Sequence, residues 1–174
     1  MNRKVLEKIG TEFERVVASY LKANFSECKV IHNLEVYSAY LKKNTQIDII
    51  FIHPKLVCVI ELKNWTKYVS GSYDDVNWKG KSRSTNTLYH PNIYYQNLIH
   101  IRALRNAMRR RGIVPVPCAN LICFPDGTDL LTECAECCTL SQLCHKLRTL
   151  IDNSQTIIDV DSTYSVIENL DTRS

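Results

Sequence analysis

Apolar residues near the start of the chain recur at spacings of three and four, as they do on one face of an α-helix. The stripe consists of Leu6, Ile9, Phe13, Val16, Val17, Tyr20 and Ala23. It predicts an amphipathic helix over residues 3–24. Glu14 lies at the edge of the stripe, so its side chain can reach the element on which this helix packs.

Short apolar runs after this helix predict β-strands. Residues 29–37 read as a first strand, and YLKKNTQ reads as a polar connection. The segment IDIIFIHPKLVCVIELKNW at 47–65 reads as two strands joined by a turn at Pro54-Lys55. The following segment, YVSGSYDDVNWKG, predicts a further strand and turn, and KGKSRSTNTLYHP a polar loop.

The second half of the chain predicts helices and strands in alternation. Pro91-Asn92 marks the start of a helix over roughly 93–111, and Gly112 is expected just beyond its end. VPVPCANLICF and ECCTL predict strands, residues 141–152 predict a last helix, and the tail SVIENLDTRS is expected to be peripheral. This order predicts an α/β fold with a mixed central sheet flanked by helices.

We expect a single domain because no Pro-, Gly- or Ser-rich linker interrupts the chain of 174 residues. Its core is expected at about 3–125, followed by a C-terminal strand–helix extension at about 130–174. No apolar run is long enough to span a membrane, and the charged N-terminus has no signal-peptide core. We therefore expect a cytoplasmic protein without a membrane partner.

The most hydrophobic hairpin of the chain carries two carboxylates and an amine. With Pro54-Lys55 at the centre of the turn, Asp48 faces Glu61 directly. Side chains alternate along a strand, so Lys63 shares the face of Glu61, and Asp48 joins them there. Directly opposed positions have Cβ atoms about 5 Å apart.

Two carboxylates at that separation repel each other unless a positive charge lies between them. Mg²⁺, which proteins bind through one or two carboxylates, meets this requirement. Lys63 is then placed to orient or deprotonate the attacking water. The alternative is an ion pair, in which Lys63 neutralises Asp48 and Glu61 at the open end of a sheet.

Four segments, taken in order, resemble the nuclease-related domain (NERD) family of the PD-(D/E)xK nuclease superfamily. They are GTEFERVVASYL at 10–21, QIDIIFI at 46–52, VCVIELKNW at 57–65 and HPNIYYQ at 90–96. They span about half the chain, and together they are more specific than any one of them. Two departures leave the catalytic groups in place: Ile47 stands where the superfamily name expects proline, and His90-Pro91 replaces Asn-Pro.

The resemblance implies a restriction-endonuclease-like α-β-β-β-α-β core and cleavage of phosphodiester bonds with Mg²⁺, for which Mn²⁺ can substitute. The site residues that it implies are the helix carboxylate Glu14, the metal ligands Asp48 and Glu61 with the backbone carbonyl of Leu62, the catalytic lysine Lys63 and the second-helix glutamine Gln96. The alternative is a catalytically silent module of the same fold that binds nucleic acid without cutting it.

Basic residues point to nucleic acid, with DNA as the favoured substrate. The net charge of +4 is mild, so it indicates a polyanion partner only where the bases cluster. Candidates are Lys79, Lys81 and Arg83 in the loop before the second helix, and Arg102 and Arg105 on that helix. A solvated helix face explains the arginines equally well. Many nucleases of this fold act as homodimers because two strands need two sites, but the sequence identifies no interface.

In a chain expected to be intracellular, eight cysteines indicate buried thiols rather than disulfides. Four of them crowd together with a histidine, at Cys134, Cys137, Cys138, Cys144 and His145. The CxxC spacing with a later Cys-His allows a zinc site, and a structural zinc protein is the third alternative. A buried strand followed by a helix is favoured, because a second tight ligand pair and turn glycines are missing from this segment.

Overall fold

The computed structural model describes residues 3–82 and 86–170, with side chains from residue 12 onward. The order of the elements is α1 (Arg3–Asn24), β1 (Lys29–Ser38), β2 (Lys43–His53), β3 (Leu56–Leu62), β4 (Tyr68–Gly71), β5 (Asn77–Lys81), β6 (Leu88–Pro91), α2 (Ile93–Arg110), β7 (Cys118–Phe124), β8 (Asp129–Thr132), β9 (Cys137–Thr139), α3 (Leu140–Asp152) and α4 (Val160–Glu168).

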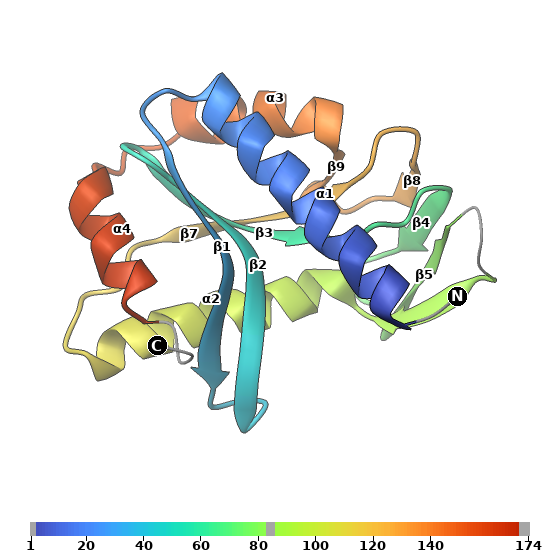
Figure 1. The fold of residues 1–174 in the computed structure, drawn as a ribbon, viewed down its shortest axis with the longest axis horizontal. Coiled ribbons are helices and arrows are strands. Elements are labelled where there is room, and N and C mark those ends of the chain that lie inside the picture. Colours follow the sequence, from blue (N-terminus) through green and yellow to red (C-terminus); the bar gives the residue numbers. More distant parts are fainter. Residues whose placement is uncertain (1–2, 83–85, 171–174) are drawn as a thin grey trace.

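A mixed five-stranded sheet, in the order β1-β2-β3-β7-β9, forms the centre of the molecule (Figure 1). Strand β2 pairs antiparallel with both β1 and β3, and β7 and β9 continue the sheet in parallel with β3. Helices α1 and α3 cover one face, and α2 and α4 cover the other. This is a restriction-endonuclease-like core with helices on both sides of the sheet, as the sequence predicted.

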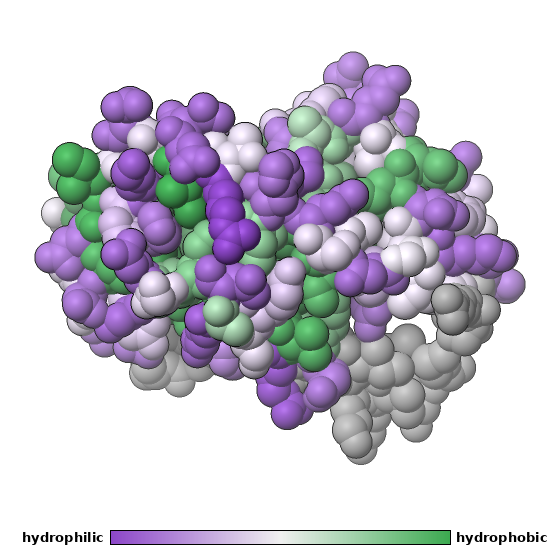
Figure 2. All heavy atoms as spheres, turned by 90° about the horizontal axis from the view of Figure 1, so that it is seen from above, coloured by the Kyte–Doolittle hydropathy of each residue, from purple (hydrophilic) through white to green (hydrophobic). Residues whose placement is uncertain are grey.

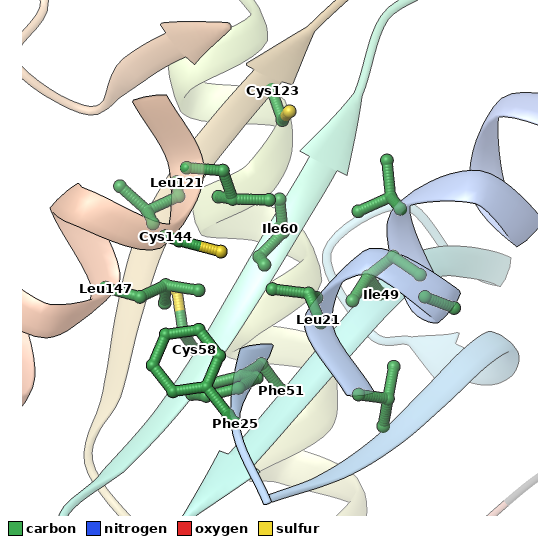
Figure 3. Close-up of a cluster of buried hydrophobic side chains, with 14 of the residues drawn as sticks. Leu21, Phe25, Ile49, Phe51, Cys58, Ile60, Leu121, Cys123, Cys144 and Leu147 are labelled. Atoms are coloured by element: carbon green, nitrogen blue, oxygen red, sulfur yellow. The ribbon is translucent and has the colours of Figure 1, made fainter. Parts of the chain in front are cut away.

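Side chains from α1 and α3 interlock over the first face of the sheet. Leu21 of α1 and Leu147 of α3 are fully buried there and meet Phe51, Cys58 and neighbouring strand residues (Figure 3). Strand β3 is buried along its whole length, because helices cover both of its faces. The apolar sequence LVCVI of β3 therefore follows from its central position, and Glu61 is the one acid within this strand.

The hairpin register is the predicted one. Strands β2 and β3 pair from His53–Leu56 to Ile49–Ile60, as a turn centred on Pro54-Lys55 requires. Beyond Ile60, β3 continues alongside β7 with Glu61 opposite Ile122. The position opposite Asp48 is therefore where the ladder between β2 and β3 ends.

Asp48 also lies where the side-chain alternation of β2 changes step. Ile50 contacts the α2 side of the sheet, and so does Ile47, which strict alternation would place on the other face. The facing residue on β1 is Asn33, whose φ of 58° is a left-handed conformation that asparagine tolerates better than most residues. At this step Asp48 reaches the end of β3, where its Oδ2 atom accepts a hydrogen bond from the Leu62 N–H, and it lines the same cleft as Glu61 and Lys63.

A second sheet, in the order β6-β5-β4-β8, adjoins the first and was not predicted as such. Its core contains Trp65 and Trp78, both buried, so neither tryptophan is available to a ligand. Gly80 of β5 is required by this packing, since a Cβ atom there would lie 2.0 Å from the Trp65 ring. The segment expected to be a polar loop therefore supplies the end of β5 and all of β6.

Residues 165–170, the described part of the tail, are not peripheral, contrary to the sequence-based expectation. Helix α4 begins at an Asp159 cap and buries Ile167 and Leu170 against the sheet. On the face shown in Figure 2, hydrophilic side chains predominate and hydrophobic ones form separate small patches. Within the described residues, none of the helices is both long and apolar enough to cross a lipid bilayer.

Candidate active site

A cleft of about 980 Å³ opens where the β1–β2 hairpin, the β4–β5 loop and the start of α2 meet. Figure 1 shows the long hairpin running across α2. All five side chains predicted for the site line this cleft: Glu14 from α1, Asp48 from β2, Glu61 at the end of β3, Lys63 directly after it, and Gln96 from α2. The fold thus joins residues that lie up to 82 positions apart in the sequence.

Glu61 is the most enclosed group of the cleft, with 2% of its side chain exposed. Its Oε1 atom accepts hydrogen bonds from Lys63 Nζ at 2.6 Å and from Gln96 Nε2 at 2.8 Å. Burial acts to raise the pKa of Glu61, but the Lys63 charge and the adjacent His100 outweigh it and hold that pKa below its usual range. Glu61 is therefore a carboxylate that two partners fix in position: Lys63, directly after β3, and Gln96 on α2.

Asp48 is held in a different electrostatic state. Its Oδ2 atom accepts a hydrogen bond from the Leu62 N–H at 2.8 Å. Burial and the charge of Glu61 raise the pKa of Asp48 to about 8, with a smaller contribution from Glu14. The contact with Leu62 involves its amide, so a metal-binding role of the Leu62 carbonyl stays a prediction.

The donor atoms of the cleft suit a hard divalent cation. Glu14 Oε2 is a buried acceptor without a hydrogen-bond partner, which is costly unless a cation or water satisfies it. Glu61 Oε2 likewise has no aligned hydrogen bond, although His100 Nδ1 lies 3.1 Å away. Among the described residues, no three His, Cys, Asp or Glu side chains are gathered into a complete metal site. Mg²⁺ does not need one, because one or two carboxylates suffice and waters and phosphates complete its shell.

His100 is the residue that sequence reasoning missed. It is buried, lines the cleft and places Nδ1 at 3.1 Å from Glu61 Oε2, although the two atoms are not aligned as a hydrogen bond. It follows Gln96 by four positions on α2, so both side chains face the same way. That spacing of four positions on a predicted helix was the signal in the sequence that pointed to it.

Asn92 fixes the wall of the cleft beside α2. Its Oδ1 caps the helix by accepting from the Tyr95 N–H, and its Nδ2 donates to the carbonyls of Ser72, Tyr73 and Asp75. One buried amide therefore joins the start of α2 to the β4–β5 loop.

We expect Asn92→Ala to lower the free energy of unfolding by about 2–4 kcal/mol, since both the cap and the bonds to the loop are lost. Asn92→Asp keeps the cap but cannot donate to the three carbonyls. It should therefore lower the free energy of unfolding by at least half as much as Asn92→Ala does. Urea unfolding measures both, with the exposed Asn77→Ala as control. An Asp variant as stable as the unaltered protein would show that the loop bonds contribute nothing.

The predicted basic surface lies apart from the cleft. Lys79 is exposed and Lys81 half-buried on β5, while Arg102 is exposed and Arg105 half-buried on α2, and none of the four lines the cleft. Arg83 lies outside the described residues. Contact between these side chains and nucleic acid stays a prediction, and the lysines that do line the cleft are Lys43 and Lys63.

The cysteine cluster is divided between two sides of the sheet. Cys137 packs with the tryptophans of the second sheet, and Cys138, next to it on β9, packs with α1 and α3. Burial raises the pKa of Cys137, which disfavours the thiolate that zinc binds. A single tetrahedral site cannot take both thiols, so the geometry favours buried free thiols over the zinc alternative.

Comparison with known families places this site in context. The nuclease-related domain family, NERD, matches residues 9–125, which include all five predicted site residues. The chain belongs to the NERD family. The general placement of NERD is the PD-(D/E)xK superfamily. The assignment of Asp48, Glu61 and Lys63 to the Asp, Glu and Lys positions of that superfamily stays a prediction.

The NERD match ends at residue 125, so β8, β9, α3 and α4 follow the matched region. An uncharacterized protein of Bacillus anthracis is 32% identical over 96 residues, which cover 55% of this chain and 42% of that protein. The match therefore spans less than half the length of this relative. A comparison with solved structures finds no match.

Proposed function

We propose that this NERD domain is a Mg²⁺-dependent nuclease that hydrolyses phosphodiester bonds, with DNA as its substrate. The observation that carries the proposal is the meeting of Glu14, Asp48, Glu61, Lys63 and Gln96 in one cleft, from four separate elements. An ion pair needed only for stability would account for Lys63 and Glu61. It would not account for the further carboxylates beside them, because like charges at close range destabilise the fold.

Each residue of the proposed site has a distinct task. Asp48 and Glu61, with the Leu62 carbonyl, hold Mg²⁺ or Mn²⁺. The bound ion would supply Lewis-acid stabilisation of the charge that develops on the attacked phosphate. Lys63 positions or activates the attacking water from its place beside Glu61, and Gln96 keeps Glu61 in one orientation through the 2.8 Å hydrogen bond. Glu14 adds negative charge that favours a cation in the cleft.

The test is a cleavage panel with Mg²⁺ and Mn²⁺ on linear, nicked, single-stranded and branched DNA and on RNA. We expect products on DNA, and a loss of about 10²–10³-fold in rate for Asp48→Ala, which removes one site carboxylate. Glu133→Ala, at an exposed acid outside the cleft, should cleave like the unaltered protein. The proposal fails if no substrate is cut with either metal, or if Asp48→Ala cuts equally well.

A second candidate function is nucleic-acid binding without cleavage. It is favoured by one observation, the 2.6 Å pair between Lys63 and Glu61, which already neutralises one carboxylate of the cleft. This alternative predicts salt-dependent binding that survives both Asp48→Ala and Glu61→Ala, with no products at any metal concentration. The same panel therefore separates the two functions.

A further inference from the structure

The charge of the cleft is unfavourable for a long stretch of phosphate backbone. Among the described residues that line it, five are carboxylates, Glu14, Asp48, Glu61, Asp74 and Asp75, and two are lysines, Lys43 and Lys63. Proteins that hold duplex DNA mainly by its backbone contact many phosphates with Lys and Arg. Two lysines cannot supply such contacts, so affinity in this cleft has to come from another part of the nucleotide.

Exposed aromatic rings line the same cleft. Tyr40, in the turn between β1 and β2, is 64% exposed, and Tyr95, in the first turn of α2, is 50% exposed. Neither ring is needed to fill a core. An exposed ring beside a nucleic-acid site is a stacking platform for bases, and stacking tolerates any base because each has a π-face.

Tyr95 stands at the end of a row of aromatic contacts on its wall of the cleft. Its ring contacts Tyr94 edge to face at 5.6 Å, and Tyr94 contacts Tyr73 in the same way at 4.8 Å. Tyr73 in turn donates a hydrogen bond from its hydroxyl to Glu136 at 2.6 Å. A platform ordered in advance loses little conformational entropy when a base stacks on it.

We propose that the cleft accepts an unpaired nucleic-acid strand, with bases stacked on Tyr40 and Tyr95 and the backbone directed toward Glu61 and Lys63. The inference rests on the nuclease function proposed above and specifies the class of its substrate. In a duplex the bases are stacked on one another and paired, so they cannot reach the two rings. Single strands, frayed ends and flaps offer their bases freely.

Fluorescence anisotropy with a short labelled oligothymidylate and a duplex of equal length tests the proposal. Binding is measured with the unaltered protein in EDTA and with Asp48→Asn in Mg²⁺, which retains both lysines of the cleft. We expect the single strand to bind more tightly than the duplex, and Tyr40→Ala and Tyr95→Ala each to weaken it about tenfold. Tyr40→Phe and Tyr95→Phe keep the ring and should bind within about twofold of their parent.

Tyr89→Ala is the matched control, because this tyrosine is 68% exposed, stands beside Lys79 and does not line the cleft. It should leave strand binding unchanged. The salt dependence should be shallow, with a slope near that of about two phosphate contacts.

Duplex binding as tight as strand binding, or alanine variants at Tyr40 and Tyr95 that bind like their parent, would overturn the inference. A loss confined to Tyr89→Ala would do so as well and would move the binding surface to β5 and β6. Strand binding that depends on the two tyrosines, combined with no cleavage in the panel, would refute the nuclease function alone. Cleavage without such binding would refute this inference alone.

Discussion

Lys63→Met is expected to reduce cleavage by about 10²–10⁴-fold and also to destabilise the fold. Lys63 is the strongest of the groups that lower the pKa of Glu61, and 16% of its side chain is exposed against 2% for Glu61. Methionine retains the length of the side chain but leaves a buried carboxylate without its cation. Removing one partner of a buried pair costs about 3 kcal/mol or more, because the other charge stays desolvated.

A second substitution separates the structural from the catalytic part of this effect. In Lys63→Met/Glu61→Gln the buried group is neutral, so most of the lost stability should return while cleavage stays absent. Urea unfolding in EDTA measures the first quantity and the cleavage panel the second. Lys67→Met, at an exposed lysine nearby, is the matched control and should change neither. If the single variant unfolds at the same urea concentration as the unaltered protein, the pair with Glu61 carries no stability.

The parts of the fold that the sequence predicted are those with long, periodic patterns. Helix α1 has the predicted bounds, and α2 and α3 agree within one residue at each end. The hairpin register followed from one turn, because the numbers of facing residues keep a constant sum. All five site residues could be named because the spacing of Asp48, Glu61 and Lys63 fixes them relative to that register, and Glu14 and Gln96 sit on periodic helices.

The missed features depend on contacts between distant segments. Strands β4 and β8 pair in parallel although about 60 residues separate them, and each has four residues, too few for a reliable alternation. The hydrogen bond between Asp48 and the Leu62 N–H joins two strands just beyond the end of their ladder, where no regular register predicts it. His100 becomes part of the site only because α2 crosses the end of β3.

Asp48→Asn is expected to stabilise the metal-free protein at alkaline pH while abolishing cleavage. Burial and the charge of Glu61 raise the folded-state pKa of Asp48 to about 8, whereas an unfolded aspartate titrates near 4. Between about pH 4 and about pH 8 the folded protein therefore binds more protons than the unfolded chain, and stability falls as pH rises. Above about pH 8 the folded state holds an unfavourable negative charge that asparagine does not have.

The gain from Asp48→Asn should be small near pH 5 and reach the order of 2 kcal/mol near pH 8.5. This gain in unfolding free energy is smaller than the pKa shift alone would give. Asp48 is half-buried and borders an open cleft, where water screens its charge. Asparagine can still accept the Leu62 N–H bond, so the change isolates the charge.

Urea unfolding in EDTA at both pH values measures the gain in stability, with the exposed Asp152→Asn as control. An equal effect at the two pH values, or a loss of stability at the higher one, would mean that burial and the charge of Glu61 do not raise the pKa of Asp48. A gain that appears only at high pH, in a variant that no longer cleaves, would identify Asp48 as a carboxylate kept at a cost in stability for the sake of the site.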